Sequence, residues 1–186
     1  MWLIEEPDLI KAGIAIPIFW AAETASKLDC HVLLAGQGAD ELFGGYHRYL
    51  SKYKREGAKA VQQSMFNDLM KSHEVNFQRD EPVCAYYGVD LRLPYVDCEV
   101  ARFALSLPLN QKIDSPTDLL RKKVLRQVAR NLGLPESLAF RPKKAVQYAT
   151  GVDKALRRLA REKGLTPQGY IKQVFETVYP DWEEKA

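Results

Sequence analysis

The chain has 186 residues, of which 46% are hydrophobic and 27% charged, and its formal net charge at pH 7 is +3. This composition excludes a disordered chain and is typical of a globular protein large enough for one domain with a core. No apolar run reaches the length of a bilayer span, and the N-terminal stretch MWLIEEPDLIK is acidic. We therefore expect neither a membrane protein nor a secretory signal peptide.

Three cysteines are present, and none belongs to a CxxC pair: Cys30, Cys84 and Cys98. An odd number of scattered cysteines is typical of buried thiols in a reducing compartment, so we expect a cytoplasmic protein. Charge is unevenly distributed, because residues 1–50 carry seven acids against three bases whereas residues 121–163 are strongly basic. A basic stretch can bind an anion, bind nucleic acid or simply solvate helices, and solvated helix faces are the default interpretation. We expect no nucleic-acid partner because no recognisable module is present.

The expected elements begin with a helix over residues 9–28, which Pro17 should break or kink because a mid-helix proline removes a hydrogen bond. Residues 31–35 (HVLLA) form the best strand candidate, and their uninterrupted apolar character predicts a strand buried on both faces. A glycine-rich loop follows, and then a helix to about Tyr53. Helical spacing resumes after Gly57 and continues to about residue 86.

The second half of the chain begins with an extended segment over residues 90–97, fixed by a proline and ending at Asp97, which is placed as the N-cap of the next helix. The sequence Ser-Pro-Thr-Asp at 115–118 resembles a capping box with proline at the first helical position, and it predicts a helix through residues 119–132 that Gly133 ends. A loop over residues 140–151 precedes two further helices.

These elements predict an α/β fold that is predominantly helical and has an incomplete parallel sheet, because a glycine loop that follows a strand normally belongs to a sheet of several strands. We treat residues 1–186 as a single partial domain. Its three parts are the glycine-loop strand and helices (10–56), a helical and extended acid segment (57–110) and the basic C-terminal helices (111–186).

The glycine loop LLAGQGADELFGGY spans residues 33–46. It is not a dinucleotide-binding fingerprint, because Glu41 stands where the third glycine is needed, and it lacks the Gly-Lys-[Ser/Thr] of a Walker A loop. Gly36 and Gly38 let a ligand approach the backbone, whereas Asp40 and Glu41 repel a bare phosphate. The acids are explained if a divalent cation lies between them and the phosphate. The alternative is that they cap a helix and that glycines 44–45 merely turn the chain.

Two further segments carry clustered charge. In RDEPVCAYYGVDLRLPYVD (79–97), Asp90 and Arg92 alternate about Leu91 and so share one face. Together with Arg79 and Asp80 they form either a surface ion-pair network, the more ordinary interpretation, or a half-buried polar site. In FRPKKAVQYATG (140–151), one of two lysines is placed to reach a phosphate, although a solvated loop is the more ordinary interpretation.

The three segments together resemble the synthetase domain of glutamine-dependent asparagine synthetase and its relatives, over about residues 10–165. Residues 35–46 resemble the family motif S-G-E-G-[SA]-D-E-x-F-G-G-Y. Residues 79–97 resemble R-D-x-x-x-x-A-x-x-x-x-E-x-R-x-P-F-L-D. The triplet at 141–143 resembles the R-x-K loop. The first two motifs are long and specific, so chance does not explain the agreement of both.

The resemblance implies the later part of an adenine-nucleotide α-hydrolase-like domain, also called a PP-loop ATPase domain. It also implies a reaction in which the side-chain carboxylate of aspartate, or of another small carboxylate, attacks the α-phosphate of ATP. Pyrophosphate leaves, and ammonia then displaces AMP to give asparagine. ATP and Mg²⁺ are the implied cofactors. The implied partners are an upstream synthetase half and a glutaminase subunit.

Site residues follow from motif positions. Asp40 would be a magnesium ligand, and Gly36, Gly38 and Glu41 would surround the nucleotide. Lys143 would neutralise charge on the phosphates or the acyl-adenylate.

The implied catalytic set is Lys143, Asp90, Gln37 and Arg92. Asp90 occupies the position of the motif glutamate, which in β-lactam-forming relatives pairs with a tyrosine as the base. Arg92 would orient the acids.

The chain departs from the family pattern in four ways. Gln37 replaces a glutamate, and an amide cannot accept a proton or stay anionic as a carboxylate does. Asp90 is one methylene shorter than glutamate. The S-G-G-x-D-S pyrophosphate loop is absent from residues 1–186, and Trp2 stands where a glutaminase domain needs cysteine. We therefore expect a ligase that is incomplete or inactive alone, or alternatively a non-catalytic scaffold, and an exposed sheet edge that favours a homodimer.

Overall fold

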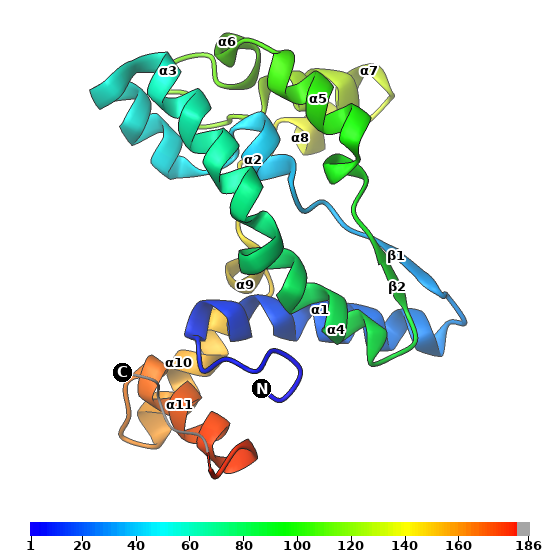
Figure 1. Cartoon of the computed structure of the whole chain (residues 1–186), viewed down its shortest axis with the longest axis vertical. Coiled ribbons are helices and arrows are strands. Elements are labelled where there is room, and N and C mark those ends of the chain that lie inside the picture. Colours follow the sequence, from blue (N-terminus) through cyan, green and yellow to red (C-terminus); the bar gives the residue numbers. More distant parts are fainter. Residues whose placement is uncertain (182–186) are drawn as a thin grey trace. The chain divides into compact units, whose positions relative to one another are not determined.

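The computed structural model describes residues 1–181 and consists mainly of helices, with two short strands. This arrangement confirms an α/β class in which helix predominates. The chain divides into two compact units (Figure 1). Unit 1 comprises residues 1–33, 74–91 and the described residues from 144 onward, and unit 2 comprises residues 34–73 and 92–143. The expectation of a single partial domain over residues 1–186 stays a prediction.

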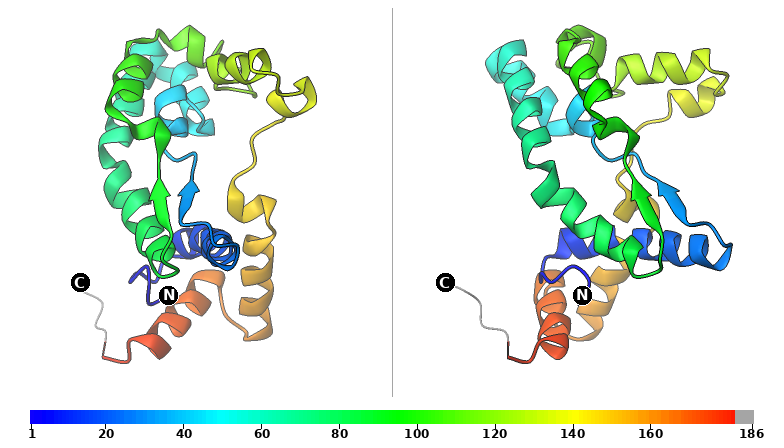
Figure 2. Two further views of the ribbon diagram at one scale, coloured as in Figure 1. Left: turned by 90° about the vertical axis from the view of Figure 1, so that its right-hand side faces the viewer. Right: turned by 45° about the vertical axis from the view of Figure 1, so that its right-hand side comes forward.

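The strands β1 (Val32–Leu34) and β2 (Asp90–Arg92) form a two-stranded sheet in the described part of the chain. The Asp90 amide donates to the His31 carbonyl oxygen at 2.8 Å, and the Ala35 amide donates to the Arg92 carbonyl oxygen at 2.9 Å. Both strands advance in the same direction along this ladder, so the pairing is parallel (Figure 2). The predicted strand at residues 31–35 is confirmed.

One face of this sheet is covered and the other is not. Leu33 and Leu91 pack with Ala22 and Cys84 of the α1 and α4 helices, whereas Val32 is 52% and Leu34 is 69% exposed. The prediction that the strand is buried on both faces is therefore wrong for residues 1–181. Among these residues, helices cover one face only.

The core of unit 1 is built around α1 (Leu9–Lys27), which contacts α4 (Gln78–Ala85), α10 (Val152–Glu162) and α11 (Pro167–Val178). Small residues on α1, such as Ala12, allow a close approach to α10 and α11. The unit also contains the π-helical turn η1 (His73–Phe77), most of which falls within it, and the short helix α9 (Val146–Ala149).

Helix α1 continues through Pro17 rather than breaking there, and Pro17 is buried. Burial of its ring in the core of unit 1 offsets the hydrogen bond that the proline lacks. By length and composition alone, α1 is apolar enough to cross a membrane, which corrects the expectation that no run in the sequence reaches that length. Its contacts with α4 and α10 place part of its apolar surface in the core of unit 1, and 28% of its most apolar stretch is buried.

Of the three cysteines, only Cys84 is buried, and burial raises the pKa of its thiol to about 11. Cys30 and Cys98 are exposed, so the prediction of buried thiols is wrong for these two.

Unit 2 contains the short helix α2 (Ala39–Phe43) and the long helix α3 (His47–Ser72). The predicted interruption at Gly57 is confirmed, because this residue has φ 81° and divides α3 into two helical segments. The remaining elements of unit 2 are η2 (Pro94–Val96), α5 (Cys98–Ser106), α6 (Leu109–Lys112), α7 (Lys123–Asn131) and α8 (Glu136–Ala139). Two apolar clusters join these elements, one between α3 and α6 and one among α2, α5 and α7.

The two predicted helix caps of this unit have different outcomes. Asp97 accepts hydrogen bonds from the amides of Glu99 and Val100 and begins α5, as expected. The capping box at residues 115–118 is wrong, because α7 begins only at Lys123. Asp118 instead accepts hydrogen bonds from the amides of residues 120 and 121 and so folds the preceding loop.

Candidate functional site

The glycine loop connects β1 to α2 by a tight turn, and its glycines serve different purposes. Gly38 has φ 86°, and a Cβ atom there would lie 2.4 Å from Val96 Cγ1. Gly44 has φ 74°, and its Cβ would lie 2.7 Å from Ile113 Cγ1. Both positions need glycine for backbone conformation and packing. Gly36, in contrast, faces open space, since a Cβ atom there would meet nothing within 4 Å.

Asp40, in the first turn of α2, lies between two lysines. Its Oδ2 atom accepts a hydrogen bond from Lys143 Nζ at 2.6 Å, and its Oδ1 atom lies 2.9 Å from Lys122 Nζ. Burial disfavours the charged carboxylate, but the two ammonium groups outweigh burial and hold the pKa of Asp40 below its usual value. Burial lowers the pKa of Lys122, and the charge of Asp40 offsets part of that effect.

Gly45 provides the space that the Asp40 carboxylate occupies. A Cβ atom on Gly45 would lie 1.6 Å from Asp40 Oδ1 and 2.4 Å from Lys122 Cε. The alternative that glycines 44–45 merely turn the chain therefore accounts for Gly44 but not for Gly45.

Glu41, the next residue of α2, is buried in unit 2 and only 3% exposed, and its charge acts on Lys122. The Tyr46 hydroxyl donates a hydrogen bond to Glu41 Oε1 at 2.5 Å, and burial together with Glu41 raises the pKa of Tyr46. The Tyr46 ring also contacts two cations, with Arg48 Cζ 4.2 Å and Lys143 Nζ 5.0 Å from its centroid. Tyr46 thus joins the buried acid to the lysine loop.

The other predicted site residues lie as follows. Gln37 is half-buried in the turn before α2. Asp90 and Arg92 are exposed on β2, on the face opposite Leu91, so the prediction that they share one face is confirmed. Asp90 belongs to unit 1 and is not among the residues that unit 2 gathers around Asp40.

Arg79 and Asp80 are neither a surface network nor part of this cluster. Both are buried, and Arg79 donates from Nε and Nη2 to the two oxygens of Asp80 at 2.6 and 2.9 Å. This bidentate pair is internal to unit 1 and satisfies two buried charges.

Lys122 is a site residue that the sequence does not reveal. It lies in a loop where Arg121 and Lys122 both have left-handed backbone conformations, with φ 54° and 51°. Such conformations cost about 1–2 kcal/mol per non-glycine residue. The one sequence signal is the basic stretch from residue 121. Its interpretation as solvated helix surface is wrong for these two residues, since Arg121 is buried and Lys122 reaches Asp40.

The cluster of Asp40, Lys122 and Lys143 carries a net charge of +1 and therefore attracts anions. Within residues 1–181, no group of three or more His, Cys, Asp or Glu residues is arranged to hold a metal ion. Asp40 Oδ1 is buried and lies 2.9 Å from the Lys122 ammonium, so a metal ion that binds this oxygen must displace the lysine. One carboxylate beside two amines fits a magnesium ion that arrives with a polyphosphate, because Mg²⁺ keeps few protein ligands.

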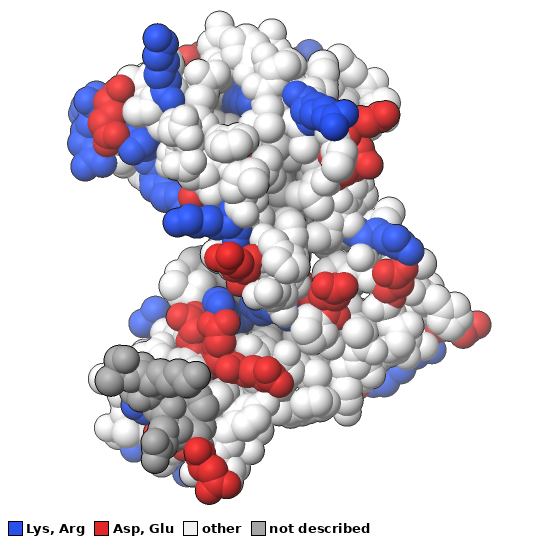
Figure 3. Space-filling view, viewed as in Figure 1, with Lys and Arg blue, Asp and Glu red and all other residues white. Residues whose placement is uncertain are grey.

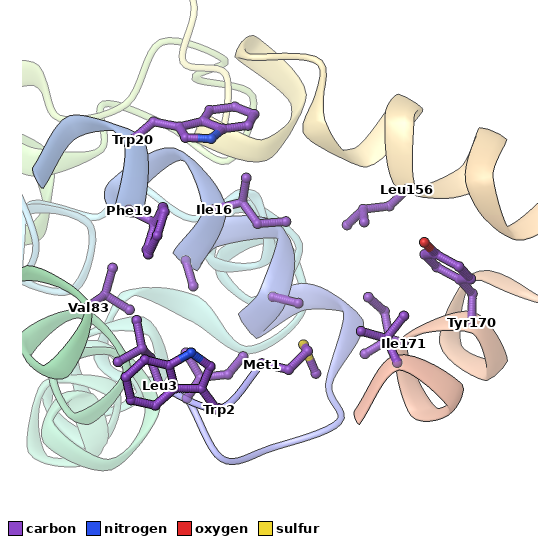
Figure 4. Close-up of a pocket in the computed structure, with 14 residues that line it drawn as sticks. Met1, Trp2, Leu3, Ile16, Phe19, Trp20, Val83, Leu156, Tyr170 and Ile171 are labelled. Atoms are coloured by element: carbon purple, nitrogen blue, oxygen red, sulfur yellow. The ribbon is translucent and has the colours of Figure 1, made fainter. Parts of the chain in front are cut away.

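Unit 1 contains an apolar cavity of about 370 Å³ (Figure 4). Trp2 and Leu3 lie on one side, Ile16 and Phe19 project from α1, and Ile171 approaches from α11. The lining offers no lysine, arginine or carboxylate side chain. This cavity therefore does not have the chemistry of a phosphate site, and the cluster in unit 2 is the better candidate.

Comparison with known proteins confirms the family resemblance. The family model described as asparagine synthase matches the chain in two overlapping stretches, residues 1–59 and 52–181. The chain belongs to the asparagine synthase family. It is 36% identical over 192 residues to a putative glutamine-hydrolysing asparagine synthetase 1 of Methanocaldococcus jannaschii, an alignment that covers 88% of this chain.

Two further relatives have lower identity. Asparagine synthetase domain-containing protein 1 of Mus musculus is 33% identical over 144 residues, and glutamine-hydrolysing asparagine synthetase 3 of Arabidopsis thaliana is 28% identical over 154 residues. These alignments cover 76% and 80% of this chain. The chain spans 35% of the length of the Methanocaldococcus protein and 23% and 26% of the other two.

Proposed function

We propose that residues 1–186 form part of the synthetase site of an ATP-dependent amide-forming ligase of the asparagine synthetase type. The reaction converts aspartate, ATP and ammonia, the last supplied free or from glutamine, to asparagine, AMP and pyrophosphate. The single observation that carries this proposal is the position of Asp40 between Lys122 and Lys143. Asp40 lies in the stretch 35–46 that resembles the family motif.

The proposed roles follow from charge and reach. Lys122 and Lys143 bind the phosphate oxygens, because both amines are positively charged and both lie at the Asp40 carboxylate. Asp40 holds the two amines in place before the ligand binds and releases them to it. Gly36 leaves the backbone of the turn accessible to the nucleotide. Tyr46 positions Lys143 through the contact of its ring with the ammonium group.

Mg²⁺ accompanying ATP would be held by Asp40 and would supply charge neutralisation on the leaving pyrophosphate. Glu41 stays buried with Tyr46 and shapes the loop rather than meeting the ligand directly. Gln37 and Arg92 are proposed to face the aspartate and the acyl-adenylate, with Gln37 contributing a hydrogen bond rather than a base. The role of Asp90 as a catalytic acid stays a prediction from the motif.

For the fold, we propose the later part of a PP-loop ATPase domain, whose remaining strands lie outside residues 1–186. The S-G-G-x-D-S loop that contacts pyrophosphate in the family would come from such a segment, in the same or a second polypeptide. The exposed Val32 and Leu34 support this proposal, because they leave one face of the parallel sheet without a cover.

A second candidate function is a non-catalytic scaffold that keeps the synthetase fold. Gln37 favours it, because the amide replaces an acid that could accept a proton. The retained Asp40, Lys122 and Lys143 favour the ligase. Nucleic-acid binding has little support, since acidic and basic side chains form small separate groups on the face shown in Figure 3. The absence of a nucleic-acid or membrane partner, the cytoplasmic location and the requirement for a glutaminase stay predictions.

The proposal is tested by pyrophosphate release from Mg-ATP in the presence of aspartate and ammonium. The assay compares residues 1–186 alone with the same chain mixed with a polypeptide that carries the S-G-G-x-D-S segment. We expect release only from the mixture, and we expect K143A to abolish it. A folded, associated mixture that releases no pyrophosphate would favour the scaffold.

A further inference from the structure

Arg126, in the first turn of α7, donates hydrogen bonds to four backbone carbonyl oxygens. Nε bonds to Arg121 and Nη2 bonds to Leu120, both at 2.7 Å. Nη1 bonds to Ala139 at 2.7 Å and to Arg141 at 2.9 Å. Each bond is short and charge-assisted, and every partner belongs to unit 2.

The four carbonyls belong to the two segments that deliver the site lysines. Residues 120–121 immediately precede Lys122, and residues 139–141 end two positions before Lys143. One guanidinium group therefore ties together two loops about twenty residues apart in the sequence. The left-handed conformations of residues 121 and 122 lie directly beside two of these bonds.

Only an arginine has the geometry that this contact requires. Its guanidinium is planar and presents five N–H donors in a fixed fork, so carbonyls on different sides can be bound at the same time. A lysine at this position would keep the charge but would offer a single ammonium group. The contact therefore depends on the shape of the side chain and not on its charge alone.

We propose that Arg126 is a positioning residue that fixes the separation of the Lys122 and Lys143 amines at Asp40 and thereby sets the affinity of unit 2 for polyphosphate. The inference rests on the proposed function for the identity of the ligand and on the four hydrogen bonds for the positioning. Arg126 acts through the two lysines and does not contact the ligand.

The ligand test measures binding of inorganic pyrophosphate by calorimetry to the wild-type chain, R126Q, K143A and the double variant. We expect R126Q to weaken binding roughly tenfold, comparable to K143A, since a misplaced charge loses most of its interaction with the anion. R126Q should weaken binding less in the K143A background than in the wild-type chain, because only Lys122 then remains for Arg126 to position. Additive losses would mean that Arg126 is merely structural and would overturn the inference.

The matched control is R130Q, because Arg130 lies one turn along α7 and pairs on the surface with Glu136 at 3.8 Å. R130Q should bind pyrophosphate like the wild type. R126K keeps the charge and is expected not to rescue binding. Rescue by R126K would show that charge alone suffices and would contradict the proposed fork. Thermal unfolding of each variant establishes that the compared chains are folded.

A second readout separates the positioning inference from the proposed function. Dimethylation of lysines with ¹³C retains their charge and gives each side chain an NMR signal. Relative to the wild-type spectrum, D40N should move the signals of Lys122 and Lys143, and R126Q should move the same two signals. If R126Q leaves both unchanged in a folded chain, the inference is overturned. If the wild type binds no pyrophosphate although R126Q moves both signals, the proposed function fails while the positioning stands.

Discussion

Asp40 Oδ1 lies 1.6 Å from the point where a Cβ atom on Gly45 would stand. The acid in the first turn of α2 and the glycine after its end therefore form one structural unit. The carboxylate folds back over the glycine and meets Lys122 and Lys143 there. The spacing between Asp40 and Gly45 in the motif follows from this contact, since any side chain at residue 45 would displace the carboxylate.

Replacement of Gly45 by alanine tests this relationship. The added methyl group collides with Asp40 Oδ1 and Lys122 Cε, and overpacking of this kind costs about 1–3 kcal/mol. We expect G45A to lower the free energy of unfolding by that amount in urea titrations. G36A is the matched control, because the Cβ position of Gly36 is open. Equal stability of G45A and G36A would show that the carboxylate does not need the glycine.

The pKa of Asp40 predicts a pH dependence of stability. Because the two lysines lower the folded-state pKa below the unfolded value of about 3.9, the ionised carboxylate stabilises the fold above that pH. This contribution is lost as the pH falls through the lowered pKa. The wild-type chain should therefore have a larger free energy of unfolding than D40N at pH 7, and this difference should shrink below about pH 4.

The measurement is urea unfolding of both chains at pH 7 and pH 3. Asp29 is the control position, because its side chain is 95% exposed. D29N should follow the wild type at both pH values. A difference between wild type and D40N that stays constant across this range would contradict the charge assignment of Asp40.

The lowered pKa of Lys112 predicts a pH dependence of stability at alkaline pH. Lys112 is 2% exposed, lines a cavity of about 400 Å³ in unit 2, and burial lowers its pKa to about 8. The unfolded chain keeps this proton up to about pH 10.4, so wild-type stability should rise relative to K112M as the pH increases from 8 to 10. We expect a relative gain of roughly 1 kcal/mol, because the amine adjoins an open pocket that screens the charge.

This pH dependence is measured by chemical unfolding of wild type and K112M at pH 7, 8.5 and 10. Lys59 lines the same cavity but is exposed, so K59M is the matched control and should show no such gain. A K112M chain that tracks the wild type at every pH would mean that Lys112 stays solvated.

The uncovered face of β1 predicts self-association. Val32 and Leu34 expose apolar side chains on a strand at the edge of the two-stranded sheet, and such edges favour pairing with another chain. Sedimentation of residues 1–186 should show a concentration-dependent dimer that V32K/L34K weakens. L28K is the control, since Leu28 is 70% exposed but lies outside the strand. A wild-type chain that remains monomeric at high concentration would refute this expectation.

The sequence predicts the elements whose signals are local. The strand at residues 32–34 follows from an uninterrupted apolar run, and the start of α5 follows from Asp97 as a cap. The break at Gly57 follows from the tolerance of glycine for the left-handed backbone. Asp40 and Lys143 share one predicted site only through the family resemblance, and the structure brings their side chains together across 103 residues.

The sequence does not predict features that depend on tertiary contacts. In the sequence, Lys122 resembles a solvated helix residue, because no neighbouring residue indicates the loop that turns its side chain toward Asp40. The late start of α7 depends on Asp118, whose carboxylate binds the amides of residues 120 and 121 instead of capping a helix. Arg126 binds carbonyls in two separate loops, and no local pattern indicates such a contact.

Calorimetric binding of inorganic pyrophosphate to residues 1–186, with and without Mg²⁺, decides whether the cluster at Asp40 is a polyphosphate site. Wild type is compared with K122A, K143A and D40N, and with K144A as a control on the same loop. We predict that K122A and K143A each weaken binding roughly tenfold, that K144A does not, and that D40N removes the effect of Mg²⁺. Equal affinity of K143A, K144A and wild type would contradict the assignment of this cluster as the polyphosphate site.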